Sequence, residues 1–243
     1  MRAAALILAA GRGDRLGAEL PKAHVCVAGR SLLAHSARAL GATPGVAFVL
    51  PVVADRSEHV IAELRADWEA SARLLDPVAG GKTRQESVQR GLESLAHQAP
   101  GTDWVLVHDA ARCLVEPSDV LRVLEAAQSS GAAIPVVPLT DTVKEIAQGR
   151  VVGTLERSRM ARAQTPQAFR ADLLREALDA ARRDGFEGTD CASLVERLGR
   201  TVAVCPGREE NLKLTTPEDL IRVQALFELR AARGARAEAP ERA

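Results

Sequence analysis

The stretch Ala3-Ala4-Ala5-Leu6-Ile7-Leu8-Ala9-Ala10-Gly11-Arg12-Gly13 decides the fold. It begins with an unbroken apolar run of strand length, and a glycine-rich turn with a cation follows directly. A strand that is apolar on both faces is typical of a parallel sheet covered by helices on both sides. Glycines at its carboxyl end let backbone N–H groups approach phosphate oxygens closely. The stretch therefore predicts a buried first strand that ends at an anion-binding turn.

The rest of the chain alternates between strand and helix patterns. We expect helices at residues 31–40, 58–65, 84–95, 117–128, 170–183, 191–198 and 217–230, and strands at 46–53, 73–75, 104–108, 132–137 and 201–205. Buried strands separated by helices predict an α/β fold with a mostly parallel sheet and helices on both faces. Such sheets bind ligands at the carboxyl ends of their strands.

Two segments break this alternation. Residues 140–154 alternate around Gln148-Gly149, which predicts a short β-hairpin that projects from the body and pairs with another subunit. Residues 231–243 contain Ala, Arg, Glu and Pro without periodicity, which predicts a flexible tail. We therefore expect a single domain over residues 1–230, with the hairpin arm at about residues 140–156.

Composition excludes several classes of protein. The 32 basic and 32 acidic side chains cancel, so the chain lacks the long-range field of a nucleic-acid or membrane-surface binder. Aromatic residues make up 2% of the chain, which argues against base-stacking platforms. No apolar run reaches the roughly 18 residues of a membrane span, and the N-terminal run has no cleavage site. The four cysteines and five histidines show no metal-site spacing, which predicts small buried thiols in a reducing cytosol and a cytoplasmic protein without zinc.

Two glycine motifs resemble known phosphate loops without matching them. In the first turn the third glycine of a dinucleotide fingerprint is replaced by Leu16, so hydride transfer is disfavoured. Gly80-Gly81-Lys82-Thr83 lacks the first glycine of an ATP-type phosphate loop, because Asp76 stands there. Since Gly80-Gly81 opens a helix, we still expect its backbone amides to meet a base or ribose.

Charged side chains gather at the predicted ligand edge. Arg12, Arg15 and Lys22 lie close to the first glycine turn, and three cations there favour a polyphosphate. Asp109 follows the strand at 104–108 and either caps a helix or, beside a polyphosphate, binds Mg²⁺. Lys213 is expected on a short strand just before the helix at 217, with a structural or a functional role.

Eight motifs occur along the chain, at 8–16, Pro21-Lys22, Gly80-Gly81 with Arg84 and Ser87, 107–112, Asp141-Thr142, Thr165-Pro166-Gln167, 189–193 and 211–220. In this order they resemble the 2-C-methyl-D-erythritol 4-phosphate cytidylyltransferase family over about residues 3 to 225. Each motif is weak alone, whereas eight in order are specific. The resemblance implies a Rossmann-like nucleotidyltransferase domain that works as a homodimer, with the hairpin as an arm that reaches into the partner's active site.

The resemblance also implies a role for each matched residue. CTP is expected to contact Ala9, Ala10, Gly11, Gly13, Gly80, Arg84 and Ser87. Its phosphates are expected between Arg15, Lys22 and Lys213, with Mg²⁺ on Asp109. The sugar phosphate is expected to contact Arg112, Thr189 and Lys213 of one subunit and Thr142, Arg157 and Thr165 of the other. Glu210 stands where some members carry an aspartate that contacts a second metal, which makes it the weaker candidate ligand.

The implied reaction is Mg²⁺-dependent transfer of CMP from CTP to 2-C-methyl-D-erythritol 4-phosphate, giving 4-diphosphocytidyl-2-C-methyl-D-erythritol and pyrophosphate. A phosphate monoester with a second pKa near 6 attacks without a general base, so no catalytic His or Cys is expected. Two alternatives stay open: an enzyme acting on ribitol 5-phosphate or another sugar or alditol phosphate, and a non-catalytic nucleotide-binding module. Some relatives carry a fused cyclodiphosphate synthase domain, and the length of this chain predicts a single activity.

Overall fold

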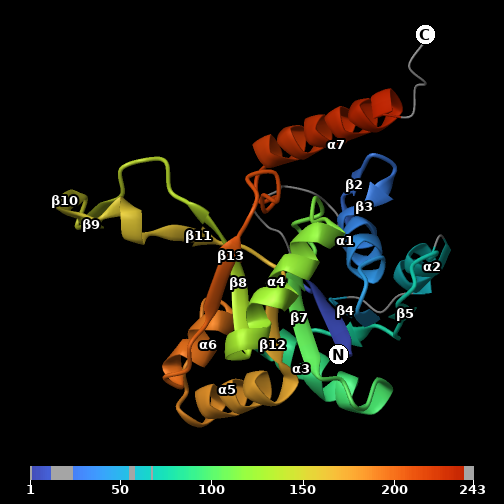
Figure 1. The fold of residues 1–243 in the computed structure, drawn as a ribbon, viewed down its shortest axis with the longest axis horizontal. Helices are drawn as coiled ribbons and strands as arrows, with labels where there is room; N and C mark the ends of the chain where they lie inside the picture. Colours follow the sequence, from blue (N-terminus) through green and yellow to red (C-terminus); the bar gives the residue numbers. More distant parts are fainter. Residues whose placement is uncertain (1, 12–23, 55–57, 67, 238–243) are drawn as a thin grey trace.

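The computed structural model describes residues 2–11, 24–54, 58–66 and 68–237, and a mixed sheet forms its centre (Figure 1). Strand β1 (Ala3–Ala9) lies between β4 (Val46–Val53) and β7 (Trp104–Asp109) and runs parallel to both. The alternating side chains of β1 are buried on both faces, as the apolar run predicts. The remaining strands of this sheet are β5 (Arg73–Leu74), β6 (Val78–Ala79), β8 (Ala132–Pro138), β11 (Ala161–Ala163), β12 (Gln167–Arg170) and β13 (Ala203–Pro206).

The strand order is β11-β8-β12-β7-β1-β4-β5, with β13 paired to β8 and β6 paired to β4. Each strand pair that includes β1, β4 or β13 is parallel, which confirms the predicted mostly parallel sheet. Strand β12 is antiparallel to both β7 and β8, and β11 is antiparallel to β8. The sequence analysis missed β11 and β12, because strands of three and four residues show too little alternation to be recognised.

Helices cover both faces of the sheet. They are α1 (Leu32–Gly41), α2 (Glu58–Ala66), α3 (Arg84–Gln98), α4 (Pro117–Ser130), α5 (Ala171–Arg183) and α6 (Cys191–Arg197). Helix α7 (Pro217–Ala237) lies apart from the sheet (Figure 1). Ala5 and Ile7 of β1 belong to the core under α1 and α4, whereas Leu6 belongs to the core under α3, α5 and α6. No helix in the described part of the chain is long and apolar enough to cross a membrane.

The expected helix starts are confirmed where a hydroxyl caps the first turn. Ser31 Oγ accepts from the backbone N–H of Ala34 at 3.1 Å and begins α1. Thr83 Oγ1 accepts from the backbone N–H of Glu86 and begins α3. Helix α7 continues to Ala237, past the predicted end at 230, because Ala and Arg favour a helix even without an apolar stripe. Its buried side packs on a small third core around Leu114 and Leu214.

The predicted hairpin is present as an arm. Strands β9 (Lys144–Ala147) and β10 (Arg150–Thr154) are antiparallel, and Gln148 and Gly149 turn between them with positive φ angles. Figure 1 shows the arm extending away from the sheet and its helices. A second small hairpin, β2 (Cys26–Val27) and β3 (Arg30–Ser31), was not predicted. The four cysteines are free, and Cys26 is exposed, contrary to the expectation that all are buried.

Candidate active site

A cavity of about 300 Å³ lies at the carboxyl ends of β1 and β7, the edge predicted for ligand binding. One wall consists of the backbone that leaves β1 at Ala9, Ala10 and Gly11. The structure brings together seven of the predicted residues there, namely Ala9, Ala10, Gly11, Arg84, Ser87, Asp109 and Lys213. The cavity therefore joins the ends of two neighbouring strands to the start of α3.

Asp109 binds two cations at the floor of this cavity. Its Oδ2 lies 2.8 Å from Lys213 Nζ, and its Oδ1 lies 3.4 Å from Arg84 Nε. The Asp109 side chain is 11% exposed, so both ion pairs are shielded on the carboxylate side. Burial alone would raise the pKa of Asp109, but Arg84 and Lys213 outweigh it and hold the pKa well below its usual range. The site therefore presents a carboxylate that is ionised at neutral pH and lies between two cations.

Position 80 requires a glycine, because the side chains of Ala10 and Ser87 lie too close for a Cβ there. A Cβ at this position would lie 2.3 Å from Ala10 Cβ and 2.9 Å from Ser87 Oγ. The expectation that backbone amides of Gly80-Gly81 are free for a base or ribose is wrong. Gly80 N–H donates to Val53 O at 2.9 Å, and Gly81 N–H donates to Ser87 Oγ at 3.1 Å. Gly81 lines the cavity and Gly80 lies outside its lining, and the backbone N–H groups of both are already bonded within the chain.

Thr165 lies under Asp109 and is buried. Its Oγ1 accepts from the backbone N–H of Asp109 at 3.1 Å and lies 3.0 Å from His108 Nδ1. Burial lowers the pKa of His108 to about 4, which keeps this ring neutral, and the Thr165 hydroxyl is the hydrogen-bond partner of its Nδ1. Thr165 therefore supports Asp109 within its own chain, and its expected contact with the sugar phosphate stays a prediction. The sequence analysis assigned no role to His108.

Arg112 lies beside this network and donates hydrogen bonds to the backbone of two separate segments. Its Nη1 donates to Asn211 O at 2.8 Å, and its Nη2 donates to Ala163 O at 3.3 Å. Asn211 Nδ2 in turn donates to Thr165 O. Lys213 follows in irregular backbone and not on a strand as expected, and Leu214 N–H donates to Ala111 O. Arg112 is thus half-buried at the edge of the site, outside the lining of the cavity.

Thr189 is exposed and lies just before α6. The next residue, Asp190, caps α6 and accepts from Gln167 Nε2 at 2.7 Å. Gln167 Oε1 also accepts from the backbone N–H of Cys191, whose Sγ lies 3.4 Å from Arg84 Nη1. The buried amide of Gln167 thereby ties the start of α6 to the cavity. The sequence analysis found Gln167 as part of a motif but assigned it no role.

Thr142 and Arg157 lie at the base of the arm and are exposed. Arg157 lies in a single 3₁₀ turn, Arg157–Arg159, and its guanidinium donates to Thr140 O. This contact joins the two chain segments that enter and leave the arm. Neither predicted residue lines the cavity of its own chain.

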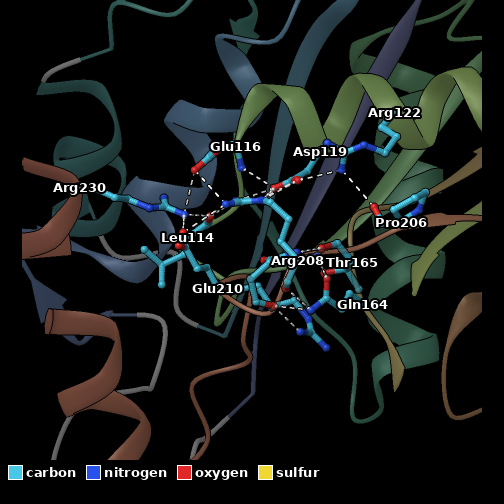
Figure 2. A network of polar contacts seen from close by, with 12 residues as sticks. Leu114, Glu116, Asp119, Arg122, Gln164, Thr165, Pro206, Arg208, Glu210 and Arg230 are labelled. Atoms are coloured by element: carbon cyan, nitrogen blue, oxygen red, sulfur yellow. Dashed lines mark hydrogen bonds and ion pairs between the residues drawn. The ribbon is translucent and has the colours of Figure 1, made fainter. Parts of the chain in front are cut away.

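Glu210, the weaker of the two expected metal ligands, pairs with arginines in this structure, and its role toward a metal stays a prediction. Its carboxylate lies 3.1 Å from Arg230 Nη2 and 3.4 Å from Arg208 Nη1, in the network that Figure 2 shows. Within residues 2–11, 24–54, 58–66 and 68–237, no three His, Cys, Asp or Glu side chains cluster so as to hold a metal. Among the described residues that line the cavity, Asp109 is the one that carries a carboxylate.

A family model described as 2-C-methyl-D-erythritol 4-phosphate cytidylyltransferase matches residues 3–229. The chain belongs to this family. The enzyme of that name from Pelotomaculum thermopropionicum is 41% identical over 97% of this chain and 98% of its own length. The crystal structure of 2-C-methyl-D-erythritol 4-phosphate cytidylyltransferase from Thermus thermophilus has a TM-score of 0.74 at 40% identity, and the match covers 93% of this chain and 98% of that one.

Other relatives in the cytidylyltransferase family are longer. The bifunctional enzyme IspD/IspF from Nitrobacter hamburgensis is 45% identical over 92% of this chain and 55% of its own length. The chain thus spans about half the length of the bifunctional relatives it matches. Three residues that the family resemblance assigns to CTP and its phosphates, Gly13, Arg15 and Lys22, lie outside the described residues.

Proposed function

We propose that this protein transfers CMP from CTP to 2-C-methyl-D-erythritol 4-phosphate and releases pyrophosphate. The observation that carries the proposal is the convergence of Arg84 and Lys213 on Asp109 in a cavity at the strand ends. Two cations beside one ionised carboxylate suit a site that receives a nucleoside triphosphate. Membership of the cytidylyltransferase family supports cytidine as the nucleoside.

The nucleotide is proposed to lie along the backbone from Ala9 to Gly11, with Arg84 and Ser87 on the facing wall. Gly80 packs against Ala10 and Ser87, and its lack of a Cβ lets these two lining residues lie close together. Gly13, Arg15 and Lys22 complete the phosphate site in this proposal on the strength of the sequence resemblance alone. Lys213 then serves the α-phosphate, because its Nζ is held at the cavity floor by Asp109.

The proposed chemistry is a single in-line displacement. An oxygen of the acceptor phosphate attacks the α-phosphorus of CTP, a new P–O bond forms, and the bond from the α-phosphorus to the bridging oxygen of the β-phosphate breaks. Pyrophosphate leaves with that electron pair. The acceptor is mostly dianionic at neutral pH, so no side chain has to remove a proton. The main catalytic requirement is to neutralise the charge that two polyanions bring together, and Lys213 and Arg84 supply cations for it.

Asp109 is proposed to hold Mg²⁺ together with phosphate oxygens of CTP. The fit is chemical: Mg²⁺ is commonly bound by one or two carboxylates plus substrate phosphates, and Asp109 remains ionised at the cavity. When bound, the ion supplies charge neutralisation at the triphosphate. Asp109 in this proposal also orients Arg84 and Lys213 before the nucleotide arrives.

The acceptor is proposed to bind between two copies of the chain. Arg112 and Thr189 come from the subunit that holds CTP, and Thr142 and Arg157 come from the arm of its partner. The arm carries exposed apolar side chains, since Ile146 is 67% and Val151 is 62% exposed, which a second copy would cover. Thr165 is proposed to act on Asp109 through its buried hydroxyl.

The test is pyrophosphate release with CTP and Mg²⁺, measured separately with 2-C-methyl-D-erythritol 4-phosphate and with ribitol 5-phosphate. We expect fast release with the branched acceptor alone and loss of release when EDTA removes the metal. Release with ribitol 5-phosphate instead would contradict the acceptor. CTP binding without release in either reaction would favour a non-catalytic nucleotide-binding module.

A further inference from the structure

We propose that Arg208 is a positioning residue for Lys213. The inference rests on the proposed function of Lys213 and adds the side chain that fixes the segment carrying it. Arg208 lies outside the cavity, and neither the sequence motifs nor the family resemblance assigned it a role. Arg208 comes shortly before Lys213 in the sequence, so contacts of Arg208 can restrain the segment that carries Lys213.

Arg208 fastens the segment to α4 through its side chain, as Figure 2 shows. Its Nε lies 2.8 Å from Asp119 Oδ1, and its Nη2 lies 2.8 Å from Asp119 Oδ2, so the guanidinium binds the carboxylate as a fork. The same Nη2 donates to Leu114 O at 2.9 Å, and Nη1 lies 3.0 Å from Glu116 Oε1. Asp119 is 5% exposed, so this contact is largely shielded from solvent.

The backbone of Arg208 is held independently. Gln164 Nε2 donates to Arg208 O at 2.8 Å, and Gln164 Oε1 accepts from Arg208 N–H at 3.2 Å. Gln164 is buried and precedes Thr165, whose hydroxyl accepts from Asp109 N–H. Arg208 is thus connected through Gln164 to the segment that also supports Asp109.

The anchoring continues from Arg208 to the residues on either side of Lys213. Asn211 O accepts from Arg112 Nη1 at 2.8 Å and from Gln164 Nε2 at 3.2 Å. On the far side, Leu214 is fully buried and its N–H donates to Ala111 O. Lys213 therefore projects from backbone that is fixed on both sides, while its side chain remains 42% exposed at the cavity.

Removing the Arg208 side chain should shift this segment only slightly, because the contacts of Gln164, Arg112 and Leu214 remain. The acidic partners of Arg208 keep other cations. Arg122 Nη1 also lies 3.2 Å from Asp119 Oδ1, and Arg230 Nη2 lies 2.9 Å from Glu116 Oε1. The fold of α4 therefore keeps compensating cations. What Arg208→Gln loses is the fork that joins the Lys213 segment to α4.

The experiment measures kcat and the KM for CTP in Arg208→Gln, Lys213→Ala and the double variant, using radiolabelled CTP. We expect Arg208→Gln to lower kcat about tenfold, because a small displacement of a charge-stabilising group has a large effect on rate, and to change KM far less. In the Lys213→Ala background the same change should cost less than about twofold, because the group it positions is gone. Thermal unfolding of each variant checks that it is folded.

Two further variants sharpen the result. Glu209→Gln is the matched control, since Glu209 is the next residue, is exposed and pairs with Arg162, so its kcat should stay at the wild-type value. Arg208→Lys keeps the charge without the planar fork and should recover only part of kcat, and it replaces Arg208→Gln if that variant is unfolded.

Wild-type kcat in Arg208→Gln would overturn the inference, as would a full tenfold loss in the Lys213→Ala background. A wild-type protein that releases no pyrophosphate with any acceptor contradicts the proposed function itself and, with it, this role of Arg208. A wild-type protein that is active, with Lys213→Ala impaired and Arg208→Gln unaffected, contradicts the positioning role alone.

Discussion

The ammonium of Lys213 lies 2.8 Å from Asp109 Oδ2, although the two residues are far apart in the sequence. Arg84 approaches the other oxygen of the same carboxylate. The three side chains come from the end of β7, the start of α3 and the irregular segment before α7. One acidic residue thus holds two cations at the cavity.

Gly80→Ala should lower the affinity for CTP, because the added Cβ would collide with Ala10 Cβ and with Ser87 Oγ at the cavity wall. We expect a loss of about 1–3 kcal/mol in the free energy of unfolding from this overpacking. Gly11→Ala is the control for stability, since a Cβ there meets no atom of the described residues within 4 Å. Denaturant titration and CTP titration calorimetry measure the two effects, and equal stability of both variants with the wild type would be inconsistent with the close approach.

Thr165→Val should destabilise the protein and reduce turnover. The variant keeps the shape of the side chain but leaves the N–H of Asp109 and the Nδ1 of His108 without their partner. Losing such buried partners costs about 1–3 kcal/mol. Thr165→Ser keeps the hydroxyl and should retain most of both properties. If Val and Ser behave alike in denaturant titrations and in kcat, the hydroxyl does not support Asp109.

The ion pairs of Asp119 predict a pH-dependent stability. Burial raises the pKa of Asp119, but hydrogen bonds from Arg208 outweigh this and lower it below the ordinary value. A carboxyl group with a lowered folded pKa stabilises the fold above its unfolded pKa of about 3.9, and this contribution is lost as the pH falls through the folded pKa. Asp119→Asn should therefore cost about 3 kcal/mol at pH 7 and progressively less below pH 4.

Denaturant titrations at pH 7 and pH 3 measure this difference. Asp172→Asn is the matched control, because Asp172 pairs with Arg170 at the surface and should change stability little at either pH. A constant difference between wild type and Asp119→Asn across this pH range would show that the ion pairs of Asp119 do not stabilise the fold.

The arm predicts complementation between inactive variants. In a mixed dimer of Arg157→Ala and Lys213→Ala chains, one site would have both defects and the other would have neither. Random exchange should thus restore about a quarter of the wild-type activity, since half of the dimers are mixed. The measurement is pyrophosphate release after mixing, with subunit exchange followed by mass spectrometry. Exchange without recovered activity would mean that Arg157 serves its own chain.

The sequence was sufficient to predict the central strands and most of the helices, because their apolar periodicity is long and regular. Strand β1 and the cap of α1 at Ser31 are examples, and Asp109, Arg84 and Lys213 meet at the predicted edge. Short strands such as β12 gave no such pattern, and their pairing depends on neighbours that are distant in sequence.

Residues that support the site were the hardest to predict. Gln164 and Arg208 act through hydrogen bonds to backbone far along the chain, so no local pattern marks them. Thr165 was found by resemblance, but its burial under Asp109 is a property of the folded sheet. Glu210 was expected near a metal because of its place beside Asn211, whereas its carboxylate turns to Arg208 and Arg230.

The most direct test of the account is the turnover of Lys213→Ala with CTP, Mg²⁺ and 2-C-methyl-D-erythritol 4-phosphate, with CTP binding measured in parallel by calorimetry. Removing one preorganised cation from a developing charge should lower kcat by about 10²-fold or more. Arg197→Ala, which breaks an exposed ion pair with Asp184, is the control and should keep wild-type turnover. Near-wild-type turnover in Lys213→Ala would contradict the claim that the pair of Lys213 and Asp109 prepares this site for transfer at the α-phosphate.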